Sequence, residues 1–168
     1  MIFASDQAGD HMKDVVVIGA GKIGTAIALM LADAGDYRVL VTDRSAAQLA
    51  KVERHPAIAT QPLDITDSQA LAATLEGRFA VLSAAPFNLT GLVAEAARAA
   101  GVHYLDLTED VATTRKVEQL AAGATKAFIP QCGLAPGFIS VVAHDLVRRF
   151  DTLDSVRMRV GALPQYPS

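Results

Sequence analysis

The chain has 168 residues, of which 51% are hydrophobic and 20% are charged, and its formal net charge is −3 at pH 7. This length predicts about one domain, with enough apolar content to fill a single core. Because the charge is slightly negative and Lys and Arg do not cluster, the composition argues against a nucleic-acid binder and against a membrane-surface binder. We therefore expect a small molecule as the partner.

The cysteine content and the uncharged runs bear on the compartment. Cys132 is the one cysteine, so it cannot form an internal disulfide, and no charged leader with an apolar core is visible. The longest uncharged runs, 79–94 and 127–143, are interrupted by Pro, Gly, Asn or Gln and do not predict membrane spans. These features predict a cytoplasmic protein.

Residues 1–12 show no periodicity and are expected to be a leader or an appended segment outside the fold.

From Val15 onward, short apolar runs alternate with segments of helical spacing, which is the pattern of βαβ units around a buried parallel sheet. The pattern predicts an α/β fold, a doubly wound parallel sheet over residues 13–150. The expected strands are VVVI, RVLVT, IATQPL, AVLSA, VHYLD and AFIPQ, at residues 15–18, 38–42, 58–63, 80–84, 102–106 and 127–131.

Helix boundaries are indicated by capping residues. Ser45 with Gln48 and Thr66 with Gln69 have capping-box spacing, and Thr108 precedes two acidic residues as an N-cap would. Four glycines stand where helices are expected to end, at Gly35, Gly77, Gly101 and Gly123.

The last part of the chain has a different pattern. In SVRMRV, residues 155–160, apolar and charged side chains alternate strictly, which predicts a half-exposed strand of an antiparallel sheet. A lone amphipathic strand cannot bury its apolar face. Residues 151–168 are therefore expected to begin a second, α+β domain that is truncated.

A glycine-rich turn, GAGKIG, follows the first expected strand and opens a helix. Gly19 would permit the tight turn, Gly21 would let a pyrophosphate approach, and Gly24 would allow close helix packing, with Ala20, Lys22 and Ile23 completing the phosphate-binding turn. Asp43, at the end of the second strand, is placed to bind the ribose hydroxyls of an adenosine. These residues predict a dinucleotide-binding Rossmann domain, and the alternative is a packing turn beside a solvated strand end.

The choice between NAD and NADP depends on two adjacent residues. Asp43 should repel a 2′-phosphate, whereas Arg44 could bind that phosphate or stack on adenine. We expect NAD, with NADP as the alternative.

Two further strand ends are expected to contact the cofactor. Asp64, with Ile65 beside it, would lie near the adenine, unless Asp64 only favours the following helix N-terminus. After the fourth strand, Ala84, Ala85 and Pro86 leave room for a ligand at the carboxyl edge of the sheet, unless they form an ordinary turn.

Together, VIGAGKIG, SAAPF, HYLDLTED, CGLAPGFISVVAHDL and VGALPQYP resemble the saccharopine dehydrogenase-like family over residues 14–168. The resemblance implies an NAD(P)-dependent oxidoreductase that transfers hydride at an amine-bearing carbon of an amino acid such as lysine or saccharopine. It also implies a homodimer and a C-terminal domain that binds the substrate. The resemblance places a turn at Gly133 beside the nicotinamide, unless this turn only joins a strand to a helix without contacting a ligand.

The same resemblance places Asp106 where substrate and nicotinamide meet, with a role in orienting the substrate amine or in proton transfer. The competing interpretation is an exposed aspartate at a helix entry. Cys132, His103 and His144 are expected to be structural, and no residues have the spacing of a metal site.

Two function classes remain open. One is the dehydrogenase, for which the present chain is the cofactor-binding part, and the other is a dinucleotide-binding module without chemistry. A short-chain dehydrogenase is excluded because no Tyr is followed by Lys four residues later.

Overall fold

The structure of the protein is a computed structural model that describes residues 12–161. The expected leader, apart from Met12, and residues 162–168 lie outside this range. The centre of the fold is a six-stranded parallel sheet in the order β3-β2-β1-β4-β5-β6. Its strands are β1 (Lys13–Ile18), β2 (Tyr37–Asp43), β3 (Ile58–Pro62), β4 (Ala80–Ser83), β5 (His103–Asp106) and β6 (Phe128–Ile129). All six expected strands are confirmed, and the last is shorter than expected.

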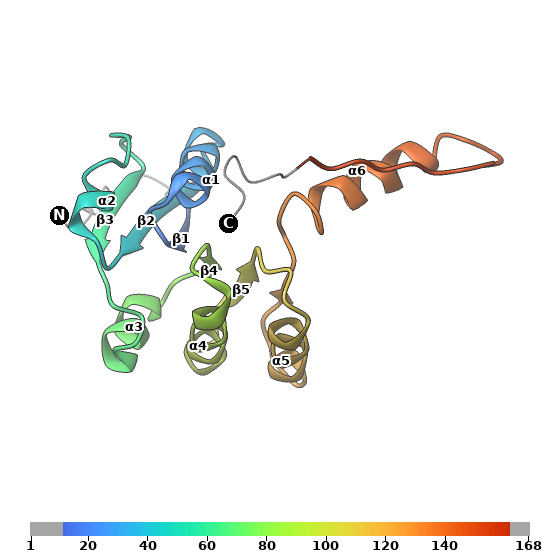
Figure 1. The fold of residues 1–168 in the computed structure, drawn as a ribbon. Coiled ribbons are helices and arrows are strands. Elements are labelled where there is room, and N and C mark those ends of the chain that lie inside the picture. The colour runs from blue at the N-terminus through green and yellow to red at the C-terminus, as the bar shows by residue number, and fades with distance from the viewer. Residues whose placement is uncertain (1–11, 162–168) are drawn as a thin grey trace, which may run out of the picture.

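The helices are α1 (Lys22–Asp33), α2 (Ala46–Leu49), α3 (Ser68–Leu75), α4 (Phe87–Ala100), α5 (Val111–Ala121) and α6 (Phe138–Val147). Figure 1 shows α1 and α2 on one face of the sheet and α3, α4 and α5 on the other. Two layers of helices around one parallel sheet confirm the doubly wound α/β architecture.

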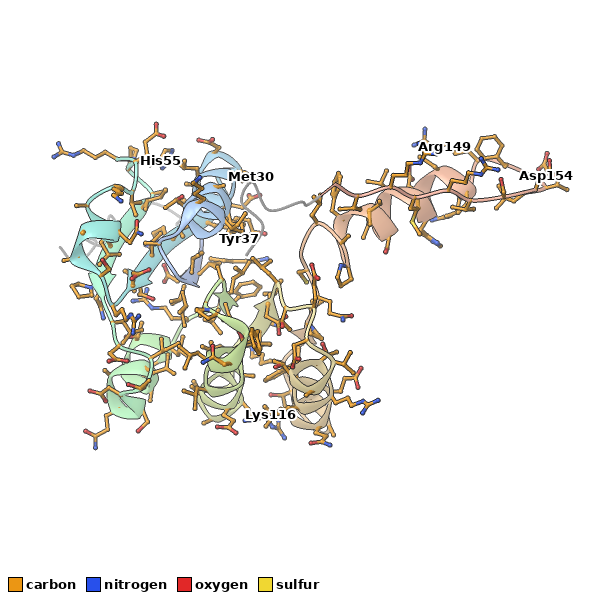
Figure 2. All side chains as sticks on the ribbon, viewed as in Figure 1. Met30, Tyr37, His55, Lys116, Arg149 and Asp154 are labelled. Atoms are coloured by element: carbon orange, nitrogen blue, oxygen red, sulfur yellow. The ribbon has the colours of Figure 1, made fainter. Side chains whose placement is uncertain are left out.

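Successive side chains of the strands point to opposite faces of the sheet and pack into two apolar cores. In β2, Val39 and Val41 face the core beneath α1 and α2, whereas Leu40 faces the core beneath α3, α4 and α5. Because both faces are covered, β1 and β2 are continuous apolar runs and not alternating ones. At the surface, Lys116 of α5 (Figure 2) pairs with Glu95 of α4 at 2.8 Å.

The helix caps agree only in part with the sequence pattern. Ser45 caps α2 as expected, and its hydroxyl accepts a hydrogen bond from the Gln48 amide. The expectation for Thr66 was wrong, because Asp67 caps α3 while Thr66 is bonded to Asp64. The carboxylate of Asp67 accepts from two amides at once, Gln69 and Ala70, which a threonine hydroxyl does less well.

Thr108 is likewise not the cap of α5. Asp110 caps this helix. The Thr108 hydroxyl, two residues before the cap, accepts from the Asp110 amide. The four glycine stops are confirmed, since all have positive φ values: Gly35 80°, Gly77 69°, Gly101 65° and Gly123 66°.

The C-terminal part projects from the rest of the fold. Figure 1 shows α6 extending away from the sheet, with the following segment running back along it. None of the residues of α6 is buried. The strand expected at 155–160 does not form within the described range, where these six residues are exposed and have no strand pairing. Strand geometry needs a partner for its backbone amides and carbonyls, and no strand among residues 12–161 pairs with this segment.

Candidate cofactor site

The carboxyl edge of the sheet has its switch point between β1 and β4, the strands from which the chain proceeds in opposite directions. In open α/β sheets, ligands bind in the crevice at this point. A cleft of about 600 Å³ lies there. It is lined by Ile18, Gly19, Gly21, Asp43, Arg44, Leu63, Asp64, Ile65, Thr66, Ala84, Ala85, Pro86, Asn88 and Leu89.

The glycine turn is closed tightly against β4. Gly19 has a φ of 106°, and a Cβ added there would lie 2.8 Å from the Ala84 carbonyl oxygen. A Cβ added to Gly24 would overlap the carbonyl oxygen of Gly19. These two positions therefore require glycine for the fold itself, before any ligand is considered.

Gly21 differs from its two neighbours in the motif. Its φ is −75°, and a Cβ added there would meet nothing within 4 Å. No contact within the described residues explains glycine at this position. The open space lies at the N-terminus of α1, where backbone amides and the helix dipole favour an anion. A pyrophosphate that approaches the backbone closely fits this space.

Asp43 connects the end of β2 to the glycine turn. One carboxylate oxygen accepts from the Ala20 amide at 2.8 Å, and the other accepts from the Ser45 amide at 2.8 Å. Each oxygen keeps a free lone pair that a ribose hydroxyl can use. The side chain is thus held in one orientation at the wall of the cleft.

Asp64 and Arg44 line the same cleft close to Asp43, because the chain before Asp64 pairs with the end of β2. Asp64 accepts from the hydroxyl and the amide of Thr66, at 2.7 and 2.9 Å. The hydroxyl and then the amide of Thr66, with a smaller contribution from the charge of Arg44, lower the pKa of this carboxyl below its usual range. Asp64 is therefore a stable anion on the same side of the cleft as Arg44.

The expected cofactor residues divide into two groups. The cleft brings together Gly19, Gly21, Asp43, Arg44, Asp64, Ile65, Ala84, Ala85 and Pro86. It does not include Ala20, which is buried, or Gly24, Lys22, Ile23 and Gly133. Thr66, Asn88 and Leu89 line the cleft without having been expected. Asn88 and Leu89 lie in the first turn of α4, which follows Pro86. The position of SAAPF at the end of a strand was therefore the sequence signal that could have predicted them as cleft residues.

Asp106 does not line the cleft and is fully buried. One carboxylate oxygen accepts from the Tyr104 hydroxyl at 2.8 Å, and the other accepts from the amides of Thr108 and Gln131 at 2.9 and 3.1 Å. The competing interpretation as an exposed helix-entry residue is wrong, because this carboxylate has no exposed surface. The Tyr104 hydroxyl, buried beside that negative charge, has its pKa raised above its usual range.

The remaining titratable residues of interest have structural partners. His103 Nδ1 accepts from the Ala127 amide at 3.0 Å, and its ring packs on Phe79. Burial, and then the negative charge of Asp106, raise the pKa of the Cys132 thiol. Among residues 12–161, no three His, Cys, Asp or Glu side chains gather as metal ligands would. Within the same range, no helix is both long and apolar enough to cross a membrane.

Residues 15–129 match the model of the saccharopine dehydrogenase NADP-binding domain. The chain belongs to this family. Membership confirms the resemblance drawn from the sequence, and it makes the domain an NAD(P)-binding Rossmann domain. The glycine turn, the open space at Gly21 and the oriented carboxylate of Asp43 are compatible with that cofactor.

Solved structures agree with the fold. Saccharopine dehydrogenase (L-Glu forming) from Saccharomyces cerevisiae is 26% identical with a TM-score of 0.67, over 82% of this chain and 32% of that one. Apo scyllo-inositol dehydrogenase from Lactobacillus casei is 17% identical with a TM-score of 0.63, over 83% and 42% of the two chains. A Rossmann-fold NAD(P)-binding family protein from Shigella flexneri is 19% identical with a TM-score of 0.56, over 71% and 66%. The chain thus spans about a third of the length of the yeast enzyme.

Proposed function

We propose that this domain binds NAD in preference to NADP and serves an oxidoreductase that acts at an amine-bearing carbon of an amino acid. The observation that carries the cofactor part is Asp43, whose carboxylate is held at the cleft wall by the Ala20 and Ser45 amides. A bound dinucleotide supplies the nicotinamide carbon that exchanges hydride with the substrate. The residues of this chain bind and orient it.

The charges around the cleft support the preference for NAD. Asp43 is oriented to accept from ribose hydroxyls, and its charge would repel a 2′-phosphate. Arg44 is the cation that could offset this repulsion, but its charge also acts on the nearby Asp64 anion. The carboxylates of Asp43 and Asp64 outnumber the guanidinium of Arg44, so the net charge here favours a ribose without a phosphate.

The substrate part rests on the family and on the resemblance of the later motifs. Saccharopine, named in the yeast relative, is an amino acid with a secondary amine, and we propose a substrate of this class, lysine included. The base that takes the amine proton is proposed to lie beyond residue 161, because Asp106 is buried and bonded on both oxygens.

The projecting C-terminal part supports a second domain. Residues 138–161, which begin with α6, expose large apolar side chains such as Phe138, Phe150 and Met158. We propose that residues 151–168 begin a domain that binds the substrate and forms a homodimer, in a cytoplasmic protein. In that arrangement the turn at Gly133 would lie where the two domains meet.

The experiment is a titration of the chain with NADH and NADPH, followed by nicotinamide fluorescence. We expect NADH to bind more tightly, and Asp43→Ala to weaken NADH binding by about 10- to 100-fold, as for the loss of hydrogen bonds to a charged group. The matched control is Asp14→Ala, which removes the 2.9 Å ion pair with Arg38 at the opposite, amino-terminal edge of the sheet. Tighter NADPH binding would contradict the preference, and equal losses in both variants would contradict the role of Asp43.

The reaction class needs a second measurement. A protein that contains this domain and a substrate domain is expected to reduce NAD with lysine, saccharopine or related secondary amines. If it binds NADH but reduces no cofactor with any of them, the interpretation as a binding module without chemistry is favoured.

A further inference from the structure

Asp106 is an unusual anion, because it is fully buried and its described donors are all neutral groups. Burying a carboxylate is costly unless its hydrogen-bonding capacity is used. Here a hydroxyl and two backbone amides use it. Three hydrogen bonds to one buried side chain indicate a structural role for Asp106, and the residues that donate them show which segments it connects.

The donors come from two loops at the carboxyl edge of the sheet. Thr108 belongs to the loop between β5 and α5, and Gln131 to the loop that follows β6. The second loop is bound twice by the same residue, because the Cys132 amide also donates to the Asp106 carbonyl oxygen at 2.7 Å. Asp106 therefore joins two loops that are adjacent at this edge but far apart in the sequence.

The loop after β6 has little else to hold it in place. Strand β6 has only two residues, Phe128 and Ile129, and it pairs with β5 alone. Gln131 has a φ of 62°, a left-handed conformation that costs free energy in any residue other than glycine. A residue persists in such a conformation when its surroundings hold it there. The bond from the Gln131 amide to the buried carboxylate holds it there, next to the bond from the Cys132 amide to the Asp106 carbonyl oxygen.

Beyond Gln131 the chain forms a closed turn. The Gly133 carbonyl oxygen accepts from the Phe138 amide at 2.9 Å, and Gly133 and Gly137 form a bridge. A Cβ added to Gly137 would overlap the Gly133 carbonyl oxygen, so the turn is internally tight. Its position relative to the sheet is then set by the residues that precede it, 131 and 132.

We infer that Asp106 is a positioning residue that anchors the turn at residues 130–137 to the carboxyl edge of the sheet. The consequence for the cofactor rests on the proposed function, in which this turn lies beside the nicotinamide. The anchor itself is independent of any ligand. Asp106 would then affect the chemistry through the turn and not by taking a proton.

Cys132 is a reporter within the anchored segment and is the one cysteine of the chain. Its alkylation by iodoacetamide, measured against pH, yields two quantities. The apparent pKa reports the burial of the thiol and then the charge near it, so a variant that keeps the burial isolates the effect of the charge. The rate at high pH, where the thiol is ionised, reports how accessible the loop makes it. The pH profile thus separates the charge of Asp106 from its anchoring bonds.

Three variants distinguish the roles. Asp106→Ala removes the acceptor and is expected to raise the high-pH rate by about fivefold or more, as for a lost hydrogen bond that held the loop closed. Asp106→Asn keeps an acceptor for the two amides without the charge, so the thiol pKa should fall while the high-pH rate stays near that of the wild type. Asp14→Ala, at the other edge of the sheet, should change neither quantity.

A folded Asp106→Ala protein with the wild-type rate would overturn the inference, and so would an equal rise in Asp14→Ala. If Asp106→Ala does not fold, amide hydrogen exchange of the wild-type protein tests the anchoring role instead. The amides of Gln131 and Cys132 should then exchange at least about tenfold more slowly than that of the exposed Leu134. Equal exchange would overturn the inference. Neither measurement uses NADH. If they contradict the anchoring role of Asp106 while the NADH titration gives the expected result, the proposed function is unaffected.

Discussion

The carboxylate of Asp43 accepts a hydrogen bond from the amide of Ala20 at 2.8 Å, across 23 residues of sequence. The end of β2 is thereby joined to the glycine turn that follows β1. The group proposed to bind the ribose and the turn proposed to bind the pyrophosphate are therefore oriented together, before any ligand arrives. Such preorganisation lowers the entropic cost of binding.

The glycines of the turn have separable roles. Gly21→Ala places a methyl group in open space at an ordinary φ, so the free energy of unfolding should change by no more than about 1 kcal/mol. The same methyl should weaken NADH binding about tenfold or more, since the pyrophosphate approaches the backbone there. Gly24→Ala overlaps the Gly19 carbonyl oxygen and should cost about 1–3 kcal/mol of stability.

Urea unfolding of both variants, with NADH titration of whichever remains folded, measures this difference. Equal stability of the two would show that the close approach at Gly24 does not limit the fold. Unchanged NADH affinity in Gly21→Ala would remove the turn from the proposed binding site.

Thr42 is fully buried at the end of β2, and its hydroxyl is the buried side-chain polar atom in residues 12–161 that has no hydrogen-bond partner. Thr42→Val replaces this hydroxyl with a methyl group of similar size. We expect the free energy of unfolding to rise by about 1 kcal/mol, because an unsatisfied buried polar group is removed. Urea unfolding at pH 7 measures the change.

Thr74→Val is the matched control. The hydroxyl of Thr74 donates to the Ala70 carbonyl oxygen at 2.8 Å and accepts from the Gln61 amide group at 3.3 Å. Its loss should lower the free energy of unfolding by about 1 kcal/mol. A destabilised Thr42→Val protein would indicate that the hydroxyl has a role that the fold alone does not reveal.

Asp110 should make the stability depend on pH. Its carboxylate caps α5 and accepts from the hydroxyl and the amide of Thr113, both at 2.7 Å. These two bonds, led by the one from the hydroxyl, lower its pKa from the usual 3.8. A lowered folded-state pKa gives stability that is fully present above pH 3.8 and is lost as the pH falls through the folded-state value.

Thermal unfolding of Asp110→Ala and of the wild type from pH 7 to pH 2 measures this contribution. The variant should have the lower Tm at pH 7, and the difference should narrow below about pH 4. Asp110→Asn keeps an acceptor for the cap without a titrating group, so its Tm at pH 7 should lie between the two. A difference in Tm that is constant over the whole pH range would contradict the assignment.

The sequence by itself determined the features that depend on local pattern. Short apolar runs predicted the six strands, because the central strands of a parallel sheet covered on both faces are shielded from water. The turn GAGKIG predicted the cofactor site because its glycines allow close approaches that other residues do not. Asp43 was identified because its distance from that turn corresponds to one helix and the strand that follows it.

The tertiary structure alone decided which polar groups meet. Thr66 and Asp67 both have cap chemistry, and the competing bond to Asp64 determines which of them caps α3. Asp106 was expected either where substrate and nicotinamide meet or at an exposed helix entry, but it is buried and accepts a hydrogen bond from the amide of Gln131, 25 residues later. Residues 155–160 alternate as a strand does, yet a strand forms only where a second one pairs with it. Local pattern specifies which structures a segment can adopt, and long-range contacts select among them, because burial and hydrogen bonding need a partner.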